Sequence, residues 1–114
     1  MTQTTVRYTS AAEIDIDGAF SYLVQHNPTA AKKWLDALDK RIAQLRIFPL
    51  MGALVDPALL RSTLGELRYL PFDNYIIFYF VLENEVLINN VLHTKRDLQA
   101  LFALYHILPY EEPR

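Results

Sequence analysis

The chain has 114 residues, of which 52% are hydrophobic and 21% charged, and it contains no cysteine. This length and composition predict a single domain, residues 1–114, with its own hydrophobic core. The lack of cysteine excludes thiol catalysis, thiolate metal sites and disulfides, and it is typical of a reducing compartment. No stretch reaches the ~18 apolar residues of a membrane span. Because Met1–Ser10 also shows no secretory signal, we expect a cytoplasmic protein without membrane contact.

Acidic and basic residues almost balance, with 11 Lys and Arg against 13 Asp and Glu. A nucleic-acid-binding protein usually carries a basic excess, because neutralising phosphates supplies most of its affinity. Residues 28–68 do contain seven basic and four acidic residues, but such a local patch is weak evidence for contact with RNA or DNA. The three glycines are too few for a glycine-rich phosphate loop.

The first half of the chain predicts a short strand and two helices. Residues 4–9 alternate as a strand does. Ser10 and Glu13 then have the spacing of a capping box, with Ser10 as the N-cap. Asn27-Pro28 suits the N-cap and first position of a second helix, which Pro49 closes. Each helix has one apolar stripe: Ala12, Ile16, Ala19, Phe20 and Leu23 in the first, and Ala31, Trp34, Leu35, Leu38, Ile42 and Leu45 in the second.

The second half predicts three strands and a short helix. Residues 49–63 form an irregular connection, and the strands are expected at Gly65–Leu70, Tyr75–Leu82 and Val86–His93. The middle strand is apolar on both faces, which suits an interior position. A short helix is expected within Lys95–Ile107, with Leu98, Leu101, Phe102 and Tyr105 at helical spacing.

Helices early in the chain and strands late in it indicate an α+β fold. We expect an N-terminal strand, then a two-helix hairpin packed on one face of a mainly antiparallel sheet of three to four strands, and a short C-terminal helix. The core of the domain spans about residues 4–97, and residues 98–114 form a C-terminal extension.

Six short motifs lie in order along these elements: the Ser10 to Ile14 pattern, Ala30-Ala31, Leu45–Pro49 with Gly52, Leu64–Arg68, Tyr75–Tyr79 and Val91–Asp97. In order and spacing the chain resembles the RelE/ParE superfamily, the toxins of type II toxin–antitoxin modules, over roughly residues 4–97. The ending at His93 to Asp97 and the two long helices resemble the ParE branch more closely.

This resemblance implies a toxin of a plasmid-stabilisation module that binds and inhibits DNA gyrase, has no catalytic activity of its own and uses no cofactor. It also implies a cognate antitoxin that neutralises the chain in a hetero-oligomer. One alternative is the RelE-like activity, a ribosome-dependent endonuclease acting on mRNA. Another is a module that has lost its toxicity and persists as an interaction domain.

Four residues are the catalytic candidates if the endonuclease alternative holds: Arg68, His93, Lys95 and Arg96. The resemblance assigns Arg68 to stabilising charge on the scissile phosphate, a task that suits a guanidinium. A histidine titrates near neutrality and can exchange a proton, and the two cations beside His93 can hold a phosphate. We therefore expect a cationic corner at the end of the last strand, with Arg68 close to it.

Each candidate also has a structural interpretation. Arg68 would form an ion pair with Glu66 or Asp97, and His93 would bond the sheet edge or the turn that follows it. Asp97 is expected to cap the C-terminal helix. Isolated His26 and His106 give no metal site. Two further apolar groups are expected to be buried, although the second could instead meet a partner: Trp34 with Leu38, Ile42 and Leu45, and the stretch Leu101, Phe102, Leu104, Tyr105, Ile107 and Leu108.

Overall fold

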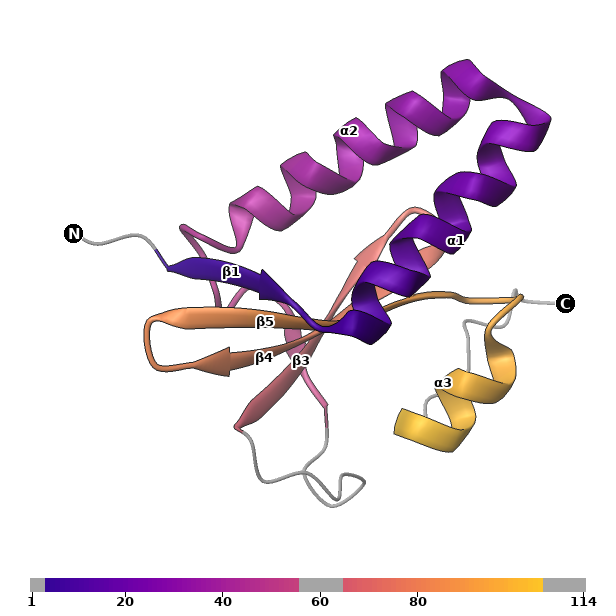
Figure 1. Cartoon of the computed structure of the whole chain (residues 1–114). Helices are drawn as coiled ribbons and strands as arrows, with labels where there is room; N and C mark the ends of the chain where they lie inside the picture. The colour runs from indigo at the N-terminus through magenta and orange to yellow at the C-terminus, as the bar shows by residue number, and fades with distance from the viewer. Residues whose placement is uncertain (1–3, 56–64, 106–114) are drawn as a thin grey trace, which may run out of the picture.

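A computed structural model describes residues 4–55 and 65–105 of the chain (Figure 1). The elements, in chain order, are β1 (Thr5–Tyr8), α1 (Ser10–His26), α2 (Pro28–Gln44), β2 (Ala53–Leu54), β3 (Glu66–Phe72), β4 (Tyr75–Leu82), β5 (Glu85–His93) and α3 (Leu98–Tyr105).

The strands form one sheet in the order β1-β5-β4-β3-β2. β1 is parallel to β5, and the other pairs are antiparallel. The α1–α2 hairpin covers one face of this sheet and α3 covers part of the other (Figure 1). The predicted α+β fold is therefore confirmed, with one strand more than expected. That strand, β2, has only two residues, too few to show an alternating pattern.

The α1–α2 hairpin starts one residue earlier than the capping box predicted. Thr9, not Ser10, is the N-cap of α1, and its Oγ1 accepts a hydrogen bond of 3.0 Å from the Ala12 amide. The same hydroxyl donates to the carbonyl of Asn89 on β5, at 2.9 Å. This contact with the sheet fixes Thr9 as the cap, and the local pattern could not show it.

The start of α2 agrees with the prediction. The Asn27 side chain accepts from the Ala30 amide at 3.1 Å, and Pro28 is the first helical residue. The helix ends at Gln44, five residues before Pro49, and Leu45 lies at its C-cap. None of the helices in the described part is both long enough and apolar enough to cross a membrane.

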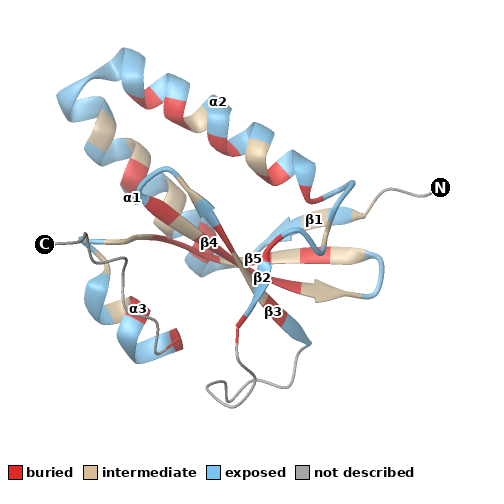
Figure 2. Ribbon diagram, turned by 180° about the vertical axis from the view of Figure 1, so that it is seen from behind, coloured by how far each residue is buried: buried red, intermediate tan, exposed pale blue. Residues whose placement is uncertain are grey.

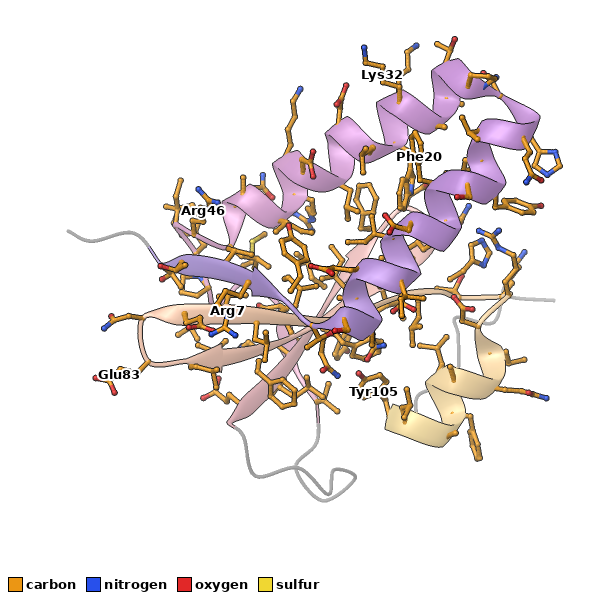
Figure 3. The ribbon with its side chains drawn as sticks, in the orientation of Figure 1. Arg7, Phe20, Lys32, Arg46, Glu83 and Tyr105 are labelled. Atoms are coloured by element: carbon orange, nitrogen blue, oxygen red, sulfur yellow. The ribbon has the colours of Figure 1, made fainter. Side chains whose placement is uncertain are left out.

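Two hydrophobic clusters hold these layers together. The first fills the space between the hairpin and the sheet, and the predicted core residues Trp34, Leu38, Ile42 and Leu45 are all buried in it or against it. Phe20 of α1 packs against this cluster (Figure 3). The second lies on the opposite face, under α3. Buried residues accordingly mark the sides of α1 and α2 that face the sheet (Figure 2).

α3 lies within the segment predicted for it and is fastened to the sheet by Tyr105. The Tyr105 ring stacks on Phe78, with centroids 3.8 Å apart. Its hydroxyl accepts from Asn89 Nδ2 at 2.7 Å and donates to Asn90 Oδ1 at 2.5 Å. Burial raises the pKa of Tyr105 to about 12. Leu101 and Tyr105 thus cover the sheet within this molecule, whereas Leu104 is exposed and residues 106–108 lie outside the described residues.

Two strand boundaries also differ from the prediction. β3 continues through Pro71 to Phe72, because beyond β2 its outer edge has no neighbouring strand in the described sheet, and proline is tolerated on such an edge. β5 begins one residue earlier, at Glu85. The turn before each of the last two strands contains a residue with positive φ, Asp73 at 53° and Asn84 at 59°, as tight hairpin turns require.

Candidate functional site

His93 ends β5, and its imidazole closes the turn that follows. The Nδ1 atom accepts hydrogen bonds from the amides of Lys95 and Arg96, at 3.1 and 3.0 Å. Nδ1 therefore carries a lone pair, and the neutral ring holds its proton on Nε2. Burial, followed by the charge of Arg96, lowers the pKa of His93. The structural interpretation of His93, as a side chain that bonds the following turn, agrees with this geometry.

Arg96 connects that turn to α1 and β4. Its guanidinium lies over the ring of Tyr22, 4.0 Å from the centroid. One of its amino groups also donates to the hydroxyl of Tyr75, at 2.5 Å. A cation over an aromatic face with a second anchor holds a defined direction. Lys95 and Arg96 are both exposed. The end of β5 is thus a cationic corner, as predicted, in which Arg96 is positioned and Lys95 extends into solvent.

Asp97 lies directly before α3, but its carboxylate does not cap that helix. Oδ2 turns back to β5 and accepts from the His93 amide at 2.7 Å. The backbone carbonyl of Asp97 accepts from Leu101 instead. The predicted capping by this side chain is therefore wrong, because its carboxylate bonds the end of β5 and, among the described residues, accepts no hydrogen bond from an amide of α3. Asp97 remains a structural residue.

A cavity of about 350 Å³ lies between α1 and this corner. Its lining includes Tyr22, Tyr75 and Arg96, together with Asp15 of α1. The Asp15 Oδ2 accepts from the Val91 amide at 2.9 Å and from Asn90 Nδ2 at 3.1 Å. The pKa of Asp15 is raised, mainly by burial of its carboxyl group. The cavity thus combines aromatic rings, one cation and one carboxylate, a set suited to binding polar groups of a partner.

No sequence motif marked Tyr22, Tyr75 or Asp15 as a site residue. Asp15 lies in the early turns of a helix, where the helix dipole alone explains an acid. Tyr75 reads as the start of a buried strand. The available signal was the spacing of Asp15, Gly18 and Tyr22, which places them along one face of α1 beside its apolar stripe.

Arg68 lies on β3, and all three nitrogens of its guanidinium bond to other groups of the molecule. It pairs with Glu66 at 2.7 Å, and its Nε donates to the same carboxylate at 2.9 Å. Its other amino group donates to the carbonyls of Gly52, at 2.6 Å, and Leu50, at 3.2 Å. The ion pair with Glu66 that the structural interpretation predicted is present, and the two carbonyl bonds were not foreseen.

The expectation that Arg68 lies close to the cationic corner is wrong. Arg68 pairs with Tyr79, whereas His93 pairs with Tyr75, which lies four residues earlier on β4. Strand geometry places the two sites about 13 Å apart along the strands and about 10 Å apart across them. The structure therefore brings His93, Lys95 and Arg96 together and leaves Arg68 outside the group.

Metal ligation has no support in the part of the chain that the structure describes. Within residues 4–55 and 65–105, no group of three or more His, Asp or Glu side chains is placed to hold a metal ion. His26 stacks against Tyr22, with ring centroids 4.6 Å apart. His106, the other isolated histidine, lies outside the described residues.

Two comparisons with known proteins match this chain. The family model for the ParE toxin of the type II toxin–antitoxin system parDE matches residues 6–98. Among solved structures, a chain of the chromosomal ParDE TA system from P. aeruginosa has the same fold, with a TM-score of 0.62. The two chains are 18% identical over 80% of this chain and 96% of that one. No curated protein sequence matches.

Proposed function

The chain belongs to the ParE toxin family of type II toxin–antitoxin systems, and we propose that it acts by binding DNA gyrase and blocking it. In this proposal residues 1–114 form a single toxin domain in the cytoplasm, and a cognate antitoxin neutralises the domain by forming a complex with it. The protein would contribute to plasmid stabilisation when its gene is carried on a plasmid. The similar fold in a ParDE system supports the antitoxin as partner.

We favour binding over RNA cleavage because of the hydrogen bonds that Arg68 and His93 form. These are the two side chains that a nuclease would need. A catalytic arginine must present free N–H groups to a scissile phosphate. Four of the five N–H groups of Arg68 instead donate to Glu66 and to the carbonyls of Leu50 and Gly52. A catalytic histidine must change its protonation near neutral pH. His93 would lose two hydrogen bonds on accepting a proton at Nδ1.

We assign the contact with the target to the corner cavity. Tyrosine and arginine are enriched among the residues that dominate binding energy at protein interfaces. Here Arg96 is already held over Tyr22, so little side-chain entropy is lost when a partner covers it. Ile14, at the rim of the same cavity, is 70% exposed and adds an apolar contact.

A gyrase supercoiling assay tests the proposal. Purified chain is added to gyrase, relaxed plasmid and ATP, and supercoiled product is measured on a gel. Inhibition that increases with toxin concentration, and that the antitoxin reverses, is expected. Normal supercoiling at a stoichiometric excess of correctly folded chain would contradict the proposal.

A translation extract provides the contrasting arm. Primer extension on mRNA from the extract shows cuts within codons if the chain is an endonuclease. Cuts that disappear in Arg68→Ala and His93→Ala would favour the RelE-like alternative. Expression without antitoxin that leaves growth unchanged, together with normal supercoiling, would favour a module that has lost toxicity.

A further inference from the structure

Large apolar side chains are exposed together on the segment that runs from the end of α2 through β2. We call this group the apolar platform. Phe48, Ile47 and Leu50 are 63%, 61% and 59% exposed. Leu54 and Met51 follow with 51% and 39%. Exposed apolar residues are ordinary when scattered, but five within eight consecutive residues mark an interaction surface.

The platform is held rigid by side chains from the sheet. The hydroxyl of Tyr79, which is fully buried, donates to the Pro49 carbonyl at 2.8 Å and accepts from the Gly52 amide at 2.9 Å. Arg68 holds the carbonyls of Leu50 and Gly52 from the other side. The polar backbone is therefore bonded inward, and the apolar side chains are left outside in a fixed arrangement. A fixed surface binds with less loss of conformational entropy than a mobile one.

Tyr79 also explains why this segment contains a glycine. A Cβ atom at position 52 would lie 2.6 Å from the Tyr79 hydroxyl and 2.8 Å from the carbonyl of Tyr69. Only glycine allows the chain to approach the sheet this closely. The buried Tyr79 hydroxyl and Gly52 thus together determine how the apolar platform is presented at the surface.

The shape of the platform suits a peptide segment. Residues 47–51 line an almost wholly apolar groove of about 470 Å³. A groove of this size accepts a few apolar side chains, such as those along one face of a helix or strand.

The charges beside the platform define the chemistry of its partner. Residues 40–55 contain Lys40, Arg41 and Arg46 and no acidic residue. Within residues 4–55 and 65–105, neither Arg41 nor Arg46 forms an ion pair. Arg46 lies at the end of α2 from which the platform continues, and Lys32 lies near the opposite end (Figure 3). Unpaired cations beside an apolar surface favour a partner with acidic flanks.

We propose that the apolar platform docks an amphipathic segment of the antitoxin, whose apolar side chains enter the groove and whose acidic side chains face Arg41 and Arg46. This inference rests on the proposed function, because it takes the antitoxin as the partner. It assigns the antitoxin to a surface at the β2 edge of the sheet, separate from the corner cavity assigned to the target.

The test measures, by titration calorimetry, binding of the chain to a candidate antitoxin, namely the product of any short reading frame found to adjoin its gene. Phe48→Ser and Leu50→Ser change exposed side chains, so both variants are expected to fold, and circular dichroism checks this. We expect each to weaken binding at least about tenfold, the effect of losing a central apolar contact. Leu104→Ser, a matched exposed leucine on α3, is expected to leave binding within about twofold.

A second pair of variants tests the charges. Arg46→Glu is expected to weaken binding and to reduce its dependence on salt, because it replaces an attraction by a repulsion. Lys32→Glu makes the same change in net charge far from the platform and is expected to have little effect.

The outcomes separate this inference from the function it rests on. If the wild-type chain does not bind the neighbouring protein, the proposed neutralisation fails. If the wild type binds and Phe48→Ser binds equally well, the platform is not the antitoxin site. Dimers of the wild-type chain that Phe48→Ser abolishes, with antitoxin binding unchanged, would assign the platform to a second copy. A Phe48→Ser variant that binds antitoxin normally but no longer inhibits gyrase would assign the platform to the target. Either this result or the dimer result would overturn the inference.

Discussion

Replacing Tyr79 by phenylalanine tests whether the buried hydroxyl holds the segment between α2 and β2. The substitution keeps the ring, which is fully buried, and removes only the hydroxyl. The buried Gly52 amide then has no partner, which costs about 1–3 kcal/mol. Loss of the partly buried bond to the Pro49 carbonyl adds about 0.5–1.5 kcal/mol. We therefore expect the free energy of unfolding to fall by about 2–4 kcal/mol, out of a total of about 5–15 kcal/mol for a small domain.

Urea denaturation measures this change, and the slope of the transition should not differ between wild type and variant. Tyr69→Phe is the matched control, because Tyr69 lies half-buried on the neighbouring strand and its hydroxyl has no hydrogen bond among the described residues. We expect the control to stay within about 0.5 kcal/mol of wild type. A Tyr79→Phe variant as stable as the control would refute the anchoring role of the hydroxyl.

Three further predictions concern the core, the corner and the target. Ile42→Ala should lower the free energy of unfolding by about 2–5 kcal/mol in urea melts, because Ile42 is only 3% exposed. Arg68→Ala should lower it by about 1–3 kcal/mol, because two loop carbonyls lose their hydrogen-bond donor. An unchanged melt for either variant would contradict the packing described here. His93 should titrate below 6.5 by NMR, with the amide shifts of Lys95 and Arg96 following the same curve. Since the unfolded chain then binds the proton more readily, His93 contributes stability above pH 6.5 that is lost as the pH falls towards its folded pKa, and a value at or above 6.5 would argue against the closed turn. Arg96→Ala should weaken gyrase inhibition about tenfold while antitoxin binding stays near that of wild type, and a loss of both together would point to misfolding or to one shared surface.

The elements that were predicted correctly are those whose sequence signals lie within one helical turn or one strand. Asn27 and Pro28 predicted the start of α2 because an N-cap side chain and the fixed φ of proline act within one turn. The apolar run of β4 predicted an interior strand, and β4 lies between β5 and β3. The stripe of α2 predicted its buried face for the same reason, since it depends only on helical spacing.

Features that depend on long-range contact were missed or misplaced. The cap at Thr9 depends on Asn89, a bulged residue of β5 eighty positions away. The position of Arg68 depends on the register of β3 against β4, which no local pattern specifies. The exposed platform also escaped prediction, because Ile47, Phe48 and Leu50 resemble core residues until the structure shows their backbone bonded inward.

The stoichiometry of gyrase inhibition tests the central claim most directly, namely that this chain acts by binding. Supercoiling activity is measured while purified chain is titrated against a fixed amount of gyrase. We predict that inhibition becomes complete as the chain approaches equimolar amounts and that it reverses when antitoxin is added. Inhibition by a small fraction of an equivalent, or full activity at excess chain, would contradict the account.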